Sequence, residues 1–215
     1  MPASAPASPW TPVALSIDIP AGTTAPGRLG AQGLAVWRSA SGKIAAWADR
    51  CPHRGMRLSH GFVRGKALSC IYHGWSFGQS GACQRIPAHP DLVPPAAIRV
   101  PRFACVEASG AIWVAETEEA PAEAPPAFPG FAGFRTLNIA APAAELRAAL
   151  GGAKITLGPL EVVALVQPLG AAECNLHLLA PEAATPAALT ELSRAAEALR
   201  RTIEAEAEAQ ACPGM

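Results

Sequence analysis

Residues 51–75 read CPHRGMRLSHGFVRGKALSCIYHGW, and this stretch decides the fold. A cysteine and a histidine stand close together at each end of it. They are Cys51 and His53 at the start, and Cys70 and His73 at the end. Sixteen residues separate His53 from Cys70, and a glycine follows each histidine within two residues. Glycine lets the backbone approach a bound group closely, so we expect two loops that each carry one sulfur and one nitrogen ligand.

Two thiolates and two neutral imidazoles suit a cluster of two irons and two bridging sulfides. The two thiolates can hold one iron, and the two imidazoles can hold the other. Exchanging thiolate for imidazole removes negative charge and raises the reduction potential above that of an all-cysteine ferredoxin. The alternative is one zinc ion bound by the same four residues, although two such loops sixteen residues apart are not a usual zinc-finger spacing.

The motif C-x-H-(x16)-C-x-x-H, with its flanking Arg54-Gly55 and Gly74-Trp75, resembles that of Rieske 2Fe–2S proteins. The resemblance covers about residues 30–115, half of the chain. It implies a Rieske-type 2Fe–2S cluster as the cofactor. The cluster and metal ligands that it implies are Cys51, His53, Cys70 and His73.

The branch of the family follows from two positions within these loops. In the respiratory branch, a disulfide between two further cysteines ties the cluster loops together; Met56 and Tyr72 stand at those positions here. The residues around both loops, together with Ile86-Pro87, are similar instead to the N-terminal Rieske domain of the α-subunits of Rieske non-haem iron oxygenases, the aromatic-ring-hydroxylating type. We expect no membrane anchor of the respiratory kind.

The N-terminal half has the pattern of a small antiparallel β domain. Three links between its apolar segments carry the same Ser-Gly pair, at residues 41–42, 80–81 and 109–110, where glycine supplies the positive φ of a tight hairpin. We predict a loose tail over residues 1–10, a Rieske 2Fe–2S domain over 11–116 and a Pro-rich linker over 117–134. The expected strands are Val13–Ile17, Leu34–Trp37, Ile44–Trp47, Ala67–Cys70, Trp75–Phe77, Ile98–Val100, Ala104–Val106 and Ile112–Ala115.

Residues 135–215 predict a small α+β domain, so the fold class is mainly β with a short sheet and a long C-terminal helix at the end. A short helix over Ala143–Leu150 should stop at Gly151-Gly152. Thr185 can cap the long helix and Pro186 suits its first position. Strands are expected at Lys154–Leu157, Glu161–Gln167 and Glu173–Leu179, and an apolar stripe along the long helix consists of Leu189, Leu192, Ala196, Leu199 and Ile203. The stripe can pack on its own sheet or on a partner helix.

The element order of this second domain resembles a shortened form of the oxygenases' C-terminal domain. In those enzymes it binds mononuclear iron through two histidines and one carboxylate. Here His177 is the only histidine after residue 118, and the last aspartate is Asp91. We interpret His177 as a core residue, and His60 and His89 as ordinary loop histidines. Mononuclear iron is therefore not expected in this chain.

The charge and composition of the chain exclude some classes of binding partner. The chain of 215 residues has 17 Lys/Arg and 17 Asp/Glu, so it is not a generally basic nucleic-acid-binding protein. No apolar stretch reaches the length of a membrane span, and the start lacks the features of a secretory signal. We expect a cytoplasmic protein with no nucleic-acid or membrane partner. Residues 1–118 carry a net charge of +5 and residues 119–215 one of −5, which indicates either a positive face for an acidic partner or two unevenly charged solvated surfaces.

The sequence thus favours electron transfer through a Rieske 2Fe–2S cluster, as a component of a multicomponent oxygenase system. The cluster would accept electrons from a reductase or ferredoxin and pass them to an oxygenase subunit, in a homo- or hetero-oligomer. Such a chain would be a redox component of an oxidoreductase rather than an autonomous oxygenase, and no catalytic residue is assigned. Two alternatives are an oxygenase whose iron site is completed by a partner, and a free-standing Rieske ferredoxin. Phosphate-binding loops and hydrolase motifs are absent from the sequence.

Overall fold

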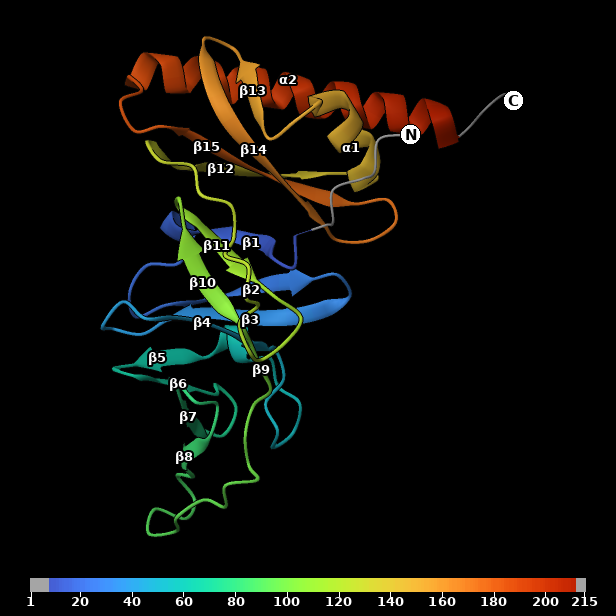
Figure 1. The fold of residues 1–215 in the computed structure, drawn as a ribbon. Coiled ribbons are helices and arrows are strands. Elements are labelled where there is room, and N and C mark those ends of the chain that lie inside the picture. Colours follow the sequence, from blue (N-terminus) through green and yellow to red (C-terminus); the bar gives the residue numbers. More distant parts are fainter. Residues whose placement is uncertain (1–7, 212–215) are drawn as a thin grey trace. The chain divides into compact units, whose positions relative to one another are not determined.

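The structure, a computed structural model, describes residues 8–211 and is mainly antiparallel β with one long C-terminal helix, as the sequence predicts (Figure 1). The chain divides into two compact units. The first unit comprises residues 8–11, 18–107 and 113–125, and the second comprises residues 12–17, 108–112 and 126–211. Residues 1–7, most of the predicted tail, lie outside the described residues. Trp10 is buried, and its indole N–H donates to the carbonyl oxygen of Glu123 at 2.6 Å.

The first unit contains two four-stranded antiparallel sheets, with the strand orders β2-β3-β4-β9 and β5-β6-β7-β8. A separate sheet has the order β1-β11-β10. The strands and short 3-10 helices of residues 11–114, which include segments of both units, are β1 Thr11–Leu15, η1 Ser16–Asp18, β2 Thr24–Leu29, β3 Gln32–Arg38, β4 Ile44–Ala48, η2 Leu58–His60, β5 Phe62–Arg64, β6 Ala67–Ser69, β7 Ser76–Gly78, β8 Cys83–Arg85, β9 Arg102–Phe103, β10 Cys105–Ala108 and β11 Ala111–Val114.

The three Ser-Gly pairs lie in hairpin turns, as predicted. They link β3 to β4, β7 to β8 and β10 to β11. Gly81 has φ +78°, and a Cβ there would lie 2.5 Å from the carbonyl oxygen of Val100. The third turn has positive φ at both central residues, Ser109 at +50° and Gly110 at +74°, the form that matches the twist of paired strands.

Some predicted strands differ from those observed. β2 was not predicted because Pro26 and Gly27 interrupt the apolar pattern expected of a strand. β2 is an edge strand of its sheet, where a proline that cannot donate a ladder hydrogen bond is tolerated. β5, β8 and β9 have three residues or fewer, too few for a pattern of alternation. The predicted strand Ile98–Val100 is wrong, since that segment joins the sheets only through a single bridge between Ala82 and Arg99.

The second unit is a four-stranded antiparallel sheet of order β12-β15-β14-β13, with two helices (Figure 1). Its elements are β12 Phe131–Ile139, α1 Ala143–Leu150, β13 Lys154–Leu157, β14 Leu160–Pro168, β15 Cys174–Pro181 and α2 Pro186–Ala211. α1 begins and ends as predicted, and α2 begins as predicted: Gly151 ends α1 with φ +68°, and the Thr185 hydroxyl accepts the backbone N–H of Ala188 at 3.3 Å. β12 begins at Phe131, inside the segment predicted as a linker, just after its last proline, Pro129.

The apolar stripe of α2 packs on its own sheet, which settles the choice between the two uses left open by the sequence. Leu192, Ala196 and Ile203 are buried in one hydrophobic core with Leu176 and Leu178 of β15. A buried leucine of this kind contributes about 1.5–3 kcal/mol relative to an exposed one. Among the helices of the described residues, none combines the length and apolar character that crossing a membrane requires.

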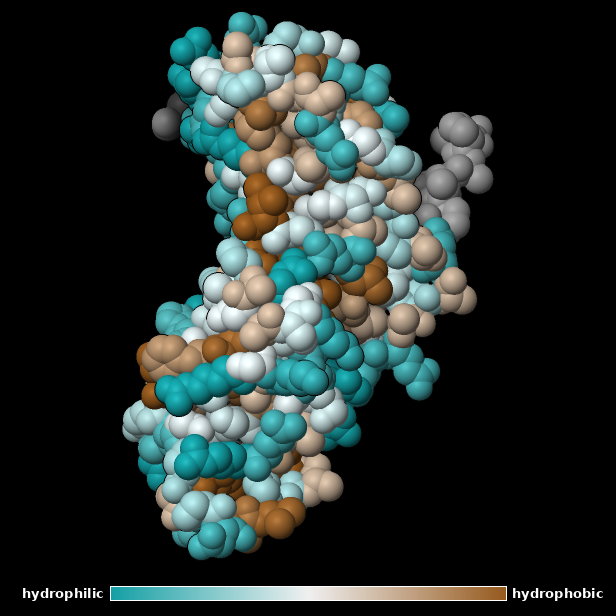
Figure 2. Space-filling view, turned by 90° about the vertical axis from the view of Figure 1, so that its left-hand side faces the viewer, coloured by the Kyte–Doolittle hydropathy of each residue, from teal (hydrophilic) through white to brown (hydrophobic). Residues whose placement is uncertain are grey.

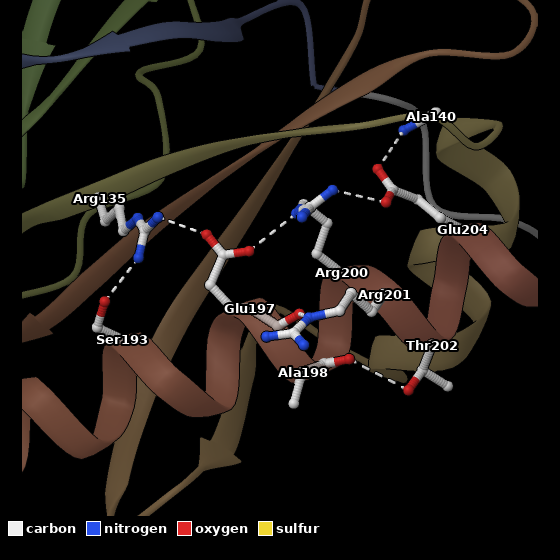
Figure 3. A network of polar contacts seen from close by, with 9 residues as sticks. All are labelled: Arg135, Ala140, Ser193, Glu197, Ala198, Arg200, Arg201, Thr202 and Glu204. Carbon is white, nitrogen blue, oxygen red and sulfur yellow. Dashed lines mark hydrogen bonds and ion pairs between the residues drawn. The ribbon is translucent and has the colours of Figure 1, made fainter.

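A chain of charged contacts joins α2 to β12 beside this core (Figure 3). Arg135 of β12 donates to the Ser193 hydroxyl at 2.6 Å and to the Glu197 carboxylate at 2.5 Å. Arg200 then donates to Glu197 at 3.0 Å and to Glu204 at 2.6 Å. The other oxygen of Glu204 accepts the backbone N–H of Ala140 at 3.1 Å, so the network ties the middle of β12 and the residue that follows it to one face of α2.

His177 lies on the other face of the sheet and is buried. Its Nδ1 lies 2.8 Å from the Thr136 hydroxyl oxygen and its Nε2 lies 3.1 Å from Gln167 Oε1, so both ring nitrogens are hydrogen-bonded. Burial lowers the pKa of His177 to about 4, against a smaller opposing effect of the Pro12 backbone. The sequence interpretation of His177 as a satisfied core residue is thus confirmed.

Because of this network, Glu197 contributes more to the stability of the folded chain than its partial exposure suggests. We expect Glu197→Gln to lower the melting temperature at pH 7 by a few degrees, because the amide loses one charge-assisted bond to Arg135 and another to Arg200. The hydrogen bond from Arg200 is the largest cause that lowers the pKa of Glu197. The ionised Glu197 carboxylate therefore contributes fully to the stability of the folded chain above the ordinary pKa of a glutamate, and this contribution is lost on acidification. Thermal unfolding followed by circular dichroism measures both effects. Glu206→Gln, on an exposed part of α2, is the matched control, and equal losses in both variants contradict the role of the network.

The buried imidazole predicts a further pH dependence. The unfolded chain protonates His177 near pH 6.5, whereas the folded chain does so only near pH 4, so stability is full above 6.5 and falls as pH drops toward 4. Between pH 7.5 and pH 5.0, the free energy of unfolding should fall by roughly 2 kcal/mol more in the natural chain than in His177→Gln. Urea titrations at both pH values measure it. His89→Gln, at an exposed histidine, should keep the full pH dependence.

Candidate iron–sulfur site

Two loops of the first unit carry the four residues that the sequence singles out. The first loop follows β4, and the second connects β6 to β7. Cys51 and Cys70 are each 3% exposed and belong to the hydrophobic core of this unit, with Trp47 and Phe77 among their neighbours in it. The two thiols therefore sit on the protein side of the loops, away from solvent.

The two loops are closed by the same pair of backbone hydrogen bonds. In the first, the N–H of Cys51 donates to the carbonyl of Met56 at 2.8 Å, and the N–H of Gly55 donates back to the carbonyl of Cys51 at 2.8 Å. In the second, Cys70 donates to Trp75 at 2.9 Å and Gly74 donates to Cys70 at 3.0 Å. Two six-residue loops of one design thus present their cysteines in the same way.

The thiols of Cys51 and Cys70 lie within hydrogen-bonding reach of each other. Burial raises the pKa of the Cys51 thiol to about 11, and the neighbouring Cys70 adds to this rise. The backbone N–H groups of His53 and Arg54 oppose it by donating to the Cys51 sulfur. Thiolate is the form that binds metal, so metal binding here releases protons and places a sulfur anion against donors that already point at it.

The imidazoles of His53 and His73 also lie together, with ring centroids 4.6 Å apart at an interplanar angle of 63°. The indole of Trp75 stacks on His53 at 4.3 Å and 3°, and the ring of Tyr72 lies 3.8 Å from that of His73. Burial first, and then the charges of His73 and Arg54, lower the pKa of His53. This favours the neutral imidazole, which is the form that binds metal.

Glycine is required at the turn of the second loop. Gly74 has φ +69°, and a Cβ there would lie 3.0 Å from Cγ of Pro87. Pro87 belongs to the Ile86-Pro87 pair, so the close approach explains why this pair accompanies the loop. In the first loop, Gly55 has φ +73° and lies against the guanidinium of Arg50.

Side-chain bonds that the sequence analysis missed close the bases of both loops. The Asp49 carboxylate accepts the backbone N–H and the hydroxyl of Ser59, each at 2.7 Å. The hydroxyls of Ser69 and Ser76 lie 2.6 Å apart across β6 and β7. The only signal for them in the sequence is a short polar residue just outside each loop.

The other candidate residues lie apart from this arrangement. His89 is an exposed loop residue, as the sequence indicates, whereas His60 is exposed but ends the short helix η2. Cys83 and Cys105 are unbridged, and burial raises the pKa of both thiols, that of Cys105 to about 12. His177 belongs to the second unit and is bonded to Thr136 and Gln167.

The four residues of the two loops form two pairs, thiol beside thiol and imidazole beside imidazole. Within residues 8–211, no three or more His, Cys, Asp or Glu side chains are grouped so that they could hold one metal ion. A pairwise donor set fits a cluster of two irons, in which each iron takes two ligands from the protein and two bridging sulfides. The residues present therefore fit the iron–sulfur group suggested by the sequence.

Comparison with known proteins agrees with this geometry. Residues 9–104 match the family model described as the Rieske [2Fe-2S] domain. The chain is 44% identical over 105 residues to oxidoreductase NdmD of Pseudomonas putida, covering 48% of this chain and 18% of that protein. It is 37% identical over 108 residues to the oxygenase subunit of 3-chlorobenzoate-3,4-dioxygenase of Comamonas testosteroni, covering 49% of this chain and 25% of that protein. The chain thus spans no more than a quarter of either relative.

The fold of nearly the whole chain is similar to that of dicamba monooxygenase. A crystal structure of apo dicamba monooxygenase superposes with a TM-score of 0.74 at 18% identity, covering 94% of this chain and 87% of that one. At this identity the likeness concerns the fold alone. The match to the family model, residues 9–104, lies in the N-terminal half and contains both candidate loops. This chain therefore contains a Rieske [2Fe–2S] domain, which spans residues 9–104.

Proposed function

We propose that Cys51 and Cys70 bind one iron of the Rieske cluster, and that His53 and His73 bind the other. The observation that carries this assignment is the pairing of two buried thiols and two adjacent imidazoles on loops of one design. The N–H groups of His53 and Arg54 would stabilise negative charge on the Cys51 sulfur. The glycines at 55 and 74 keep the backbone compact beside the bound group.

The chain acts as an electron carrier in a multicomponent oxygenase system. When bound, the cluster supplies a one-electron redox couple, and no covalent bond changes in the protein. His73 is exposed and His53 is half-buried, whereas both thiols are buried, so the imidazole edge is the side that a redox partner can approach. The similarity to an oxidoreductase and to an oxygenase subunit supports this role.

The electron comes from a reductase or ferredoxin and leaves for an oxygenase subunit. His177, the histidine of the second unit, uses both ring nitrogens in hydrogen bonds to Thr136 and Gln167. It is not available as an iron ligand without breaking that network. In this proposal, the mononuclear iron that reacts with oxygen is held by the oxygenase subunit that accepts the electron.

Metal analysis and spectroscopy test the assignment. The purified chain should contain about two irons and two acid-labile sulfides, and should give a rhombic Rieske EPR signal after reduction. Cys51→Ser and His73→Ala should each lose the signal and most of the iron, because each removes one of four protein ligands. Cys83→Ser and His89→Ala, which change a cysteine and a histidine outside the two pairs, are the matched controls and should keep it.

Two results would contradict the proposal. A Rieske signal retained in Cys51→Ser or His73→Ala excludes the assigned ligands, and zinc without sulfide excludes the cluster. A third iron that is independent of sulfide and responds to nitric oxide would mean that this chain holds an oxygen-reacting iron of its own.

The turn at Gly74 gives a separate prediction. Gly74→Ala should lower cluster content and accelerate cluster loss, because a side chain at positive φ costs about 1–2 kcal/mol and the new Cβ meets Pro87 at 3.0 Å. Gly65→Ala carries the same kind of backbone strain, with φ +59°, but no atom within 4 Å of the Cβ. Absorbance of the cluster over time should thus fall faster in Gly74→Ala than in Gly65→Ala. Equal rates in the two variants would show that the contact with Pro87 is unimportant.

A further inference from the structure

The charge around the two loops is one-sided. Between Asp49 and Asp91 the chain has six Lys/Arg and no Asp/Glu. Both cluster loops and the whole sheet β5-β6-β7-β8 lie within this segment. The positive charge that the sequence places in the N-terminal half is therefore concentrated in one part of the first unit.

Four of the six basic residues flank the loops themselves. Arg50 lies against Gly55, and Arg54 is close enough to His53 for its charge to act on the imidazole. Arg57 follows the first loop directly, and Arg85 of β8 pairs with the residue after the second loop. All four are exposed, and within residues 8–211 none of them has an ion-pair partner. Their charges are available to a partner.

Apolar side chains are exposed at the same place. Ile71 and Tyr72 of the second loop are 48% and 55% exposed. Val93 is 86% exposed and lies on the irregular segment that follows β8, in which Pro87 contacts Gly74. Phe62, 52% exposed, pairs with the residue that precedes Cys70. Figure 2 shows brown surface set among teal on the part of the molecule that holds this unit. Apolar and aromatic groups surrounded by arginines are the composition of a protein–protein interface.

We propose that this cluster face, formed by Arg54, Arg57, Arg85, Ile71, Tyr72 and Val93, docks an acidic protein electron carrier that reduces the cluster. This rests on the proposed function, to which it adds the chemistry of the partner. Carboxylates on the carrier pair with the arginines and steer its approach, and the apolar side chains exclude water once it is in contact. One electron passes from the reduced carrier, which is oxidised, to the oxidised cluster, with no bond made or broken.

The features of the face favour a protein over a nucleic acid. Aliphatic side chains such as Ile71 and Val93 are exposed on the same unit as the arginines, whereas a surface for phosphates gains nothing from exposed aliphatic groups. Asp91, two residues before Val93, adds a negative charge at the rim that a phosphate backbone would meet unfavourably. A carrier protein can accommodate it with one basic residue of its own.

Binding of an acidic [2Fe–2S] ferredoxin to the full chain tests the proposal. Fluorescence anisotropy of the labelled ferredoxin gives the Kd at about 20 mM and about 500 mM salt, and stopped-flow absorbance gives the rate of cluster reduction. Added salt should weaken binding by roughly tenfold or more. Replacing Arg54 and Arg57 together by Glu should weaken low-salt binding by at least roughly tenfold and remove most of the salt dependence.

The matched control reverses two charges at the far end of the same sheet. Arg64 and Lys66 flank the β5–β6 turn, opposite the end at which Cys70 follows β6. Replacing both by Glu should change the Kd by less than about twofold, at an equal change in net charge. Val93→Ser should weaken binding several-fold without altering the salt dependence.

Results that contradict the docking face differ from results that contradict the proposed function. Equal loss of binding in both charge-reversal variants, or binding that is insensitive to salt, overturns the docking face while the EPR signal still supports the cluster. Tighter binding of duplex DNA than of ferredoxin, lost with Arg54 and Arg57, assigns the face to nucleic acid instead. A chain that binds ferredoxin as expected but has no Rieske signal overturns the proposed function and leaves the surface standing.

Discussion

The shared closure of the two loops is the constraint on which the candidate site depends. In each loop the cysteine N–H reaches a carbonyl five residues later, and a glycine N–H returns to the carbonyl of the cysteine. These bonds satisfy the backbone polar groups of loops that enter a hydrophobic core, where unpaired groups are costly. They also turn both thiols inward and leave both imidazoles outward. Without this closure, four potential ligands would be spread over mobile connections.

The electrostatic environment differs between the buried side of the site and its solvent-exposed side. On the protein side, buried thiols accept hydrogen bonds from backbone N–H groups, which suits sulfur anions in a setting of low dielectric constant. On the solvent side, exposed arginines flank the two loops, and the sequence has no Asp or Glu between Asp49 and Asp91. In the proposed role, the backbone N–H groups stabilise the bound cluster, and the exposed arginines interact with the protein that approaches it. The second unit has a different design, with an ion network along α2 and a neutral buried histidine.

Much of the first unit could be predicted from the sequence because its signals are local. The Ser-Gly pairs identified three hairpins, and Thr185, Pro186 and Gly151 identified helix ends, since each acts through its own backbone. Edge strands such as β2 could not be predicted, because their pairing depends on a neighbour rather than on their own pattern. The same holds for the site. The cysteines and histidines are visible by spacing, but the contact of Pro87 with Gly74 and the clamp of Asp49 on Ser59 arise only from folding.

One difference between the two loops has a consequence for the movement of charge. The histidine stands two residues after the cysteine in the first loop and three after it in the second, although both loops close in the same way. That offset leaves His53 stacked beneath Trp75 and His73 open to water. In the proposed role, an electron that crossed at His73 would require the surrounding water to reorient, whereas the indole of Trp75 would shield His53 from part of that cost. The reorganisation energy of electron transfer would then depend on which of the two imidazoles faces the partner.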